Sequence, residues 1–85
     1  MATITRQGTL ELRTQNEGSK SEGRYAILLT DGGTEFTLYR AGNMPMDDAY
    51  FAPYDGFAVE VVGVEEDAYF RVEEIKRCDN ELNEE

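Results

Sequence analysis

Residues 54–72, which read YDGFAVEVVGVEEDAYFRV, contain two segments in which apolar and polar side chains alternate. Alternation with a period of two is typical of strands that bury one face. The polar residues between the two segments, at 64–68, predict a connection that turns the chain back on itself. We therefore expect two neighbouring strands here, with an inward face formed by Phe57, Val59, Val61, Phe70 and Val72.

Ile75 falls out of phase with Val72, which predicts a β-bulge near Glu73 and Glu74. Working back toward the N-terminus, residues 3–13 alternate as a first strand. Gly8 interrupts that strand and indicates a bulge or a sharp bend.

A second strand is expected at 25–29 and a third at 35–39. The turn at 30–34 joins them, because its Asp-Gly and Gly-Gly steps tolerate the positive φ angles of tight hairpins. Ala26 and Leu28 lie on the opposite face from the expected inward residues, so we expect part of both faces of the second strand to be covered. The inward residues expected in the first three strands are Ile4, Leu10, Leu12, Ile27, Leu29, Phe36 and Leu38.

Residues 44–54 form a helix-like insert that breaks the alternation. Pro45 suits a first helical turn, where its missing N–H would have no partner. Asp47 and Asp48 follow, at positions where carboxylates complement the helix dipole. Pro53 is expected to end the helix after one or two turns.

Five strands with a helix between the third and the fourth predict a mainly β fold, a five-stranded closed barrel on the OB-fold plan. The stretches Tyr54–Gly63 and Tyr69–Val72 resemble the last two strands of small bacterial OB-fold domains. The resemblance implies an OB-like barrel and carries over no functional residue. An SH3-like barrel, also built from five short strands and a helical turn, is the alternative. We expect one domain at 1–77 and a flexible acidic tail at 78–85.

The 85-residue chain has a net charge of −10, and the acidity lies in its second part. Residues 31–85 hold 15 acidic and 4 basic side chains. That charge would repel phosphate backbones, which makes nucleic acid an unlikely partner and favours a protein with a basic surface. No apolar run approaches the ~20 residues that cross a bilayer, and no signal-peptide pattern is present. Cys78 is the single cysteine, so no internal disulfide is possible and a cytoplasmic location is expected.

Catalytic patterns are missing from the sequence. It has no histidine, no nucleophile or phosphate-binding motif and no paired cysteines, so we expect no enzyme and no cofactor. Most of the candidate carboxylates for glycosidase chemistry, Asp47, Asp48, Asp55 and Glu60, are interpreted as a solvated face or as the first turn of a helix. The run 65–67 lacks the spacing of a calcium loop, so no metal site is expected.

The suggestive residues are two tyrosines. Tyr39 and Tyr69 lie opposite the inward residues of their strands, so we expect them to be exposed and to contact a partner. The sequence predicts an acidic, non-enzymatic protein-binding or scaffold module. One alternative is an acidic nucleic-acid mimic that inhibits a DNA-binding protein, and another is an OB domain that binds single-stranded nucleic acid. The oligomeric state stays open. The expected partner-binding residues are Tyr39, Tyr69, Glu60, Glu65, Glu66 and Asp67.

Overall fold

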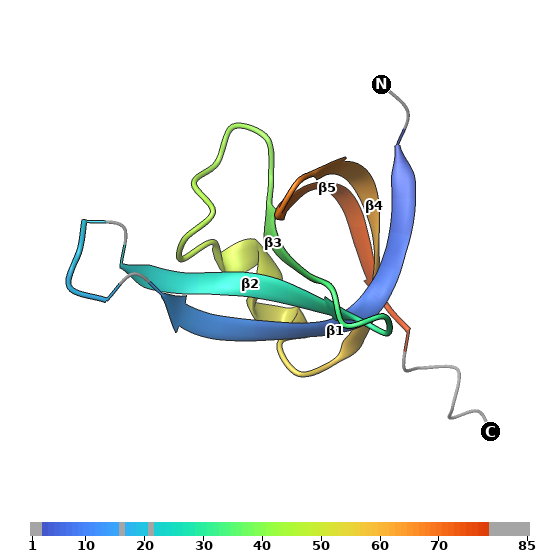
Figure 1. The fold of residues 1–85 in the computed structure, drawn as a ribbon, viewed down its shortest axis with the longest axis horizontal. Helices are drawn as coiled ribbons and strands as arrows, with labels where there is room; N and C mark the ends of the chain where they lie inside the picture. The colour runs from blue at the N-terminus through green and yellow to red at the C-terminus, as the bar shows by residue number, and fades with distance from the viewer. Residues whose placement is uncertain (1–2, 16, 21, 79–85) are drawn as a thin grey trace.

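The computed structural model describes residues 3–15, 17–20 and 22–78. This part of the chain is mainly β and forms one five-stranded sheet with a short 3-10 helix (Figure 1). Of the expected tail at 78–85, all but Cys78 lies outside the described residues. In chain order the elements are β1 (Ile4–Gln15), β2 (Gly23–Thr30), β3 (Glu35–Tyr39), η1 (Ala49–Tyr54), β4 (Ala58–Glu66) and β5 (Tyr69–Arg77).

The strands pair in the order β1-β2-β3-β5-β4, and β4 pairs back with β1. The strand pairs thus form an uneven ring around a common core. Four of the pairs are antiparallel, and β3 and β5 run parallel over the short stretch from Thr37 to Tyr39. The helix expected between the third and the fourth strand is present as η1.

Strand β1 bends because it pairs with two different strands, β4 and β2. Its first part pairs with β4, and its second part, from Gly8 onward, pairs with β2. A Cβ atom at Gly8 would lie 2.2 Å from the carbonyl oxygen of Leu29. Only glycine permits so close an approach of two backbones. The bend expected at Gly8 is confirmed, and Figure 1 shows the strong curvature of β1.

The bulge expected in the last strand is also confirmed. Val62 pairs with Glu74 but Gly63 pairs with Val72, so Glu73 is an extra residue on β5. At Gly63 a Cβ atom would lie 1.9 Å from the carbonyl oxygen of Arg71. The β4–β5 pair is therefore pressed together where β5 bulges.

Three of the expected inward residues, Ile27, Leu29 and Phe57, lie outside the main core cluster. Leu29 is only half-buried, and Phe57, which precedes β4, is 36% exposed beneath the Arg77 guanidinium. Ile27 is buried but lies outside the main core cluster, and Ile4 and Leu12 are half-buried against it. That cluster consists of Leu10, Ala26, Leu28, Phe36, Leu38, Phe51, Val59, Val61, Phe70 and Val72.

The register between β1 and β2 explains these differences. Leu10 lies opposite Leu28. Cross-strand partners share a face, so Leu28 joins the inward face of β1. Tyr25 and Ile27 on the other face are also buried, which confirms that both faces of β2 are covered. Their cross-strand neighbours on that face are Arg13 and Glu11, which form an ion pair at 2.7 Å.

The insert is helical over a shorter range than expected. Pro45 lies before η1, Asp48 is its N-cap, and Pro53 lies inside it and does not end it. The backbone N–H of Phe51 donates to the Asp48 carbonyl at 3.3 Å, in the i to i+3 pattern of a 3-10 turn. Phe51 is 1% exposed and places this turn against the core.

Candidate functional site

Two of the expected site residues, Tyr39 and Tyr69, lie side by side on the outer face of the sheet. Their rings meet edge to face, with centroids 6.0 Å apart and an interplanar angle of 81°. The parallel β3–β5 pair places Tyr39 opposite Arg71, and the β4–β5 pair places Glu66 opposite Tyr69. We call Tyr39, Glu66, Tyr69 and Arg71 the tyrosine patch.

Glu66 joins the members of the tyrosine patch. Its Oε1 atom accepts a hydrogen bond from the Tyr39 hydroxyl, and its Oε2 atom lies 3.6 Å from the Arg71 guanidinium. The pKa of Tyr39 lies above its usual range, chiefly because its hydroxyl donates to Glu66. Burial and the Glu66 charge raise this pKa further, whereas the Arg71 charge opposes the shift. Tyr69 is 42% exposed, as expected, but Tyr39 was also expected to be exposed and is half-buried, with its hydroxyl held by Glu66.

The other expected site residues lie elsewhere. Glu65 forms an ion pair with Arg6 at 2.8 Å, and Glu60 lies 3.6 Å from Lys76. Asp67 occupies the turn between β4 and β5 with φ of 54°, in the left-handed region that aspartate tolerates better than most residues. The structure therefore brings together Tyr39, Tyr69 and Glu66, and it separates Glu60 and Glu65 from them.

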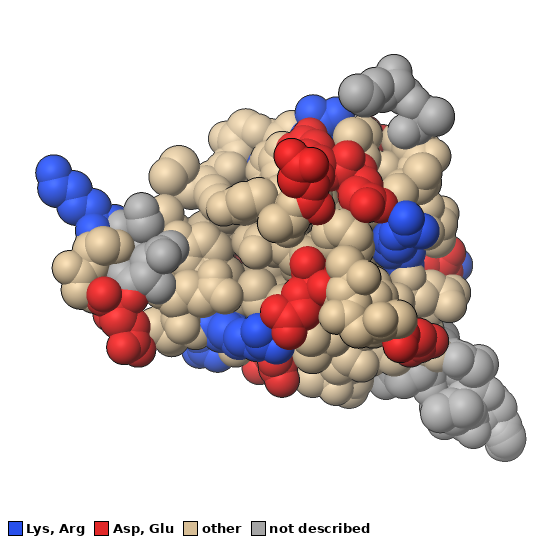
Figure 2. All heavy atoms as spheres, viewed as in Figure 1, with Lys and Arg blue, Asp and Glu red and all other residues tan. Residues whose placement is uncertain are grey.

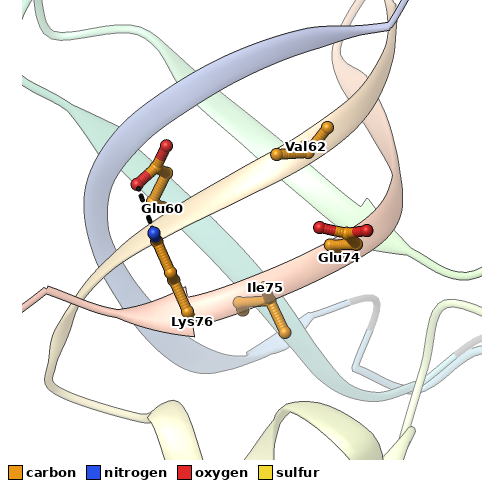
Figure 3. Close-up of a pocket in the computed structure, with 5 residues that line it drawn as sticks. All are labelled: Glu60, Val62, Glu74, Ile75 and Lys76. Carbon is orange, nitrogen blue, oxygen red and sulfur yellow. Dashed lines mark ion pairs between the residues drawn. The ribbon is translucent and has the colours of Figure 1, made fainter.

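Glu65 and Glu60 each line a hollow on the surface. The Glu65–Arg6 pair lies in an open hollow of about 350 Å³ at the end of the ring, beside Phe36 and the β2–β3 turn. Glu60 lies in a shallow pocket of about 110 Å³ on β4 and β5, with its Lys76 ion pair across it (Figure 3). Typical small-molecule sites measure about 300–1,000 Å³ and are mostly apolar. The pocket is too small for such a ligand, and the open hollow is lined mostly by polar residues, among them the Arg6–Glu65 ion pair.

The insert is anchored by a second polar cluster. Arg40 donates to both carboxylate oxygens of Asp48, at 2.9 and 2.8 Å, and its guanidinium lies 4.4 Å above the Tyr50 ring. The Asp48 carboxylate also accepts from the Tyr50 backbone N–H at 3.0 Å. The Arg40 hydrogen bonds and this backbone N–H hold the Asp48 pKa below its usual range, although burial opposes them. This cluster is structural, since its groups satisfy one another.

Charges of both signs are mixed over the visible face of the molecule (Figure 2). Among the described residues, six carboxylates lie within 4 Å of a basic side chain: Glu11, Glu35, Asp48, Glu60, Glu65 and Glu66. Arg71 belongs to the tyrosine patch but was not among the expected site residues. Its position two residues after Tyr69, on the same face of β5, was the available signal.

In the part of the chain that the structure describes, no group of three or more His, Cys, Asp or Glu side chains converges as a metal site would require. Among the same residues, no helix has the length and apolar character needed to span a membrane. The sequence matches no known family model, and neither a curated protein nor a solved structure is detectably similar to it.

Proposed function

We propose that this chain is a non-enzymatic protein-binding module on an OB-like barrel, and that the tyrosine patch is its contact surface. The strand order β1-β2-β3-β5-β4, with η1 between β3 and β4, supports the OB-like plan over the SH3-like alternative. An OB-like barrel presents the outer faces of its strands to partners, and the tyrosine patch lies on such a face.

The observation that carries the proposal is the fixed pair of tyrosine rings. Tyrosine and arginine are enriched among the residues that dominate binding energy at protein interfaces. The Tyr39 ring loses little further freedom on binding, because Glu66 already holds its hydroxyl and the Tyr69 ring packs against it. Tyr69 is left exposed, so it can fill a cavity on a partner.

The expected partner has a basic surface. The chain carries a net charge of −10, which would speed its association with such a partner. Lysine or arginine side chains of the partner can lie over the exposed Tyr69 ring as cation–π contacts, and the patch also offers them Glu66.

The two nucleic-acid hypotheses receive less support. Single-strand binding needs a basic groove beside the aromatic rings, whereas Arg71 already lies 3.6 Å from Glu66. A nucleic-acid mimic needs carboxylates spaced along one surface without counter-charges. The six ion pairs, and the mixed charges in Figure 2, weigh against that arrangement.

The test is affinity purification from the source cells with three versions of the chain, followed by binding measurements on the recovered partner. Tyr69→Ala should weaken binding at least about tenfold, the loss typical of a central aromatic contact. Met44→Ala is the control, because Met44 is a large side chain that is 65% exposed and lies outside the patch. Equal binding by wild type, Tyr69→Ala and Met44→Ala would refute the tyrosine patch as the contact surface.

A further inference from the structure

The second part of β5 has a charge order that is complementary to itself. Residues 73–77 read Glu-Glu-Ile-Lys-Arg. When two copies of this stretch are aligned antiparallel and centred on Ile75, each glutamate lies opposite a basic residue and Ile75 lies opposite Ile75. Glu73 would face Arg77, Glu74 would face Lys76, and Ile75 would face Ile75. Because Glu73 is the extra residue of the β5 bulge, the regular cross-strand pairs of opposite charge in such an antiparallel pair are the two between Glu74 and Lys76.

The backbone N–H and C=O groups of β5 at Ile75 point away from β4 and could pair with a second strand. On one side β5 pairs with β4 along its whole length, but on the other side β3 covers only Tyr69–Arg71. The Cys78 N–H donates to the Ala58 carbonyl at 2.8 Å. Because hydrogen-bonded and non-hydrogen-bonded positions alternate in an antiparallel pair, Lys76 also directs its backbone to β4 and Ile75 directs its backbone the other way. No described strand pairs with β5 on that side at Ile75.

The side chains of this stretch are accessible. Glu73, Glu74, Lys76 and Arg77 are exposed and Ile75 is half-buried. Figure 3 shows Glu74, Ile75 and Lys76 in succession along β5, with Lys76 directed toward Glu60 of β4. The Lys76 side chain is 74% exposed and its 3.6 Å contact with Glu60 is loose. Such an exposed ion pair contributes little, so Lys76 can meet a second carboxylate.

We propose that β5 joins β5 of a second copy of this chain in an antiparallel pair centred on Ile75. The two Ile75 residues would then exchange backbone hydrogen bonds across a twofold axis, and Glu74 of each copy would lie beside Lys76 of the other. Charged residues on an exposed edge strand commonly prevent such pairing. In this stretch acidic residues precede Ile75 and basic residues follow it, so the charges of the two copies attract each other in the register centred on Ile75. A shift of the twofold axis by one residue, to Glu74 facing Glu74, would make them repulsive.

The dimer is expected to be weak and to depend on salt. Each copy carries a net charge of −10, and this long-range repulsion is screened at about 0.15 M salt, where the Debye length is about 8 Å. Charge pairs in direct contact are screened less. A short strand pair buries an area at the low end of specific interfaces, where complexes are weak and transient, so we expect a Kd on the order of 100 µM.

The test is sedimentation equilibrium of the full chain at about 0.15 M salt, from about 10 µM to about 1 mM, a range that brackets the expected Kd. The mass should rise from 9.6 kDa toward twice that value. Lys76→Glu places an acidic side chain opposite Glu74 of the other copy and should weaken association at least about tenfold. The double variant Glu74→Lys/Lys76→Glu exchanges the signs at both positions, re-forms the pairs and should restore association.

Lys20→Glu is the matched control, because it makes the same charge change at an exposed position in the β1–β2 connection. It should associate as wild type does. In wild type, hydrogen exchange at the Ile75 amide should slow as concentration rises. The proposal is overturned if the mass stays at 9.6 kDa throughout. It is also overturned if Lys20→Glu weakens association as much as Lys76→Glu, or if the double variant associates no better than the single one.

Discussion

Substitution of Asp48 should separate two contributions to the stability of the insert. The Asp48 side chain is 7% exposed, caps η1 through the Tyr50 N–H and binds Arg40 with both oxygens. Asp48→Asn keeps an oxygen for the cap but loses the charge. Asparagine is as good an N-cap as aspartate, so the expected loss is that of an ion pair with one solvated partner, about 1 kcal/mol.

Asp48→Ala removes the cap as well. Loss of an N-cap costs about 1 kcal/mol more, so the free energy of unfolding should fall by about 2 kcal/mol in total. Urea denaturation followed by circular dichroism measures both variants at pH 7. Equal losses for Asp48→Asn and Asp48→Ala would refute the cap, and a loss below about 0.5 kcal/mol for Asp48→Ala, the level of an ordinary surface substitution, would refute both contributions.

The pH dependence gives a second check on Asp48. Its pKa is lower in the folded state than the usual value of an aspartate, chiefly because Arg40 donates to the carboxylate, so the charged form stabilises the fold above that usual value. The contribution is lost as the pH falls through the folded pKa. Wild type should therefore exceed Asp48→Asn in stability at pH 7, and the difference should shrink as the pH falls below about 4. A difference that stays constant down to strongly acidic pH would contradict the ion pair.

Three further results are expected. Gly63→Ala would press a Cβ against the Arg71 carbonyl oxygen at 1.9 Å, so urea denaturation should show a loss of about 3 kcal/mol. Gly32→Ala, with nothing within 4 Å, should change stability by less than about 0.5 kcal/mol. Leu28→Ala should cost about 3 kcal/mol and Leu29→Ala about 1 kcal/mol in the same assay, because Leu28 is fully buried and Leu29 is half-buried; similar losses would contradict the register of β2. Glu66→Gln should lower the pKa of Tyr39 in a spectrophotometric titration, because it removes the charged acceptor of the Tyr39 hydroxyl, whereas Glu65→Gln should leave the Tyr39 pKa unchanged.

The strands and their turns could be predicted from local patterns, but the face that β2 turns inward could not. Residues 25–29 are apolar on both faces, so their periodicity does not select one. The choice is made by the pairing of Leu28 with Leu10, a contact between residues far apart in the sequence. The prediction that Phe57 lies inward was wrong for a related reason. Phe57 continues the alternation of β4 but lies just before the strand begins, outside the core cluster, where its ring contacts the Arg77 guanidinium and stays 36% exposed.

The tyrosine patch could be predicted in part. Alternation placed Tyr39 and Tyr69 on outward positions, and Tyr69 is indeed exposed. Their contact depends on the parallel β3–β5 pair, in which Thr37 lies opposite Tyr69. Local patterns carry no information on which strands pair in parallel. The link from Glu66 to Tyr39 therefore emerges only once β3, β4 and β5 are assembled.

The bulge at Glu73 has a consequence for how the chain tolerates a change in length. Val72 and Glu74 already pair with adjacent residues of β4. A deletion of Glu73 would therefore leave all the remaining residues of β5 on their present faces. Arg71 lies before the bulge, where β5 pairs regularly with β4. A deletion of Arg71 would turn the neighbouring side chains of β5 to the wrong face. A scan of single-residue deletions along β5 should therefore find one variant that folds, the chain with a single glutamate between Val72 and Ile75, whereas the neighbouring deletions do not fold.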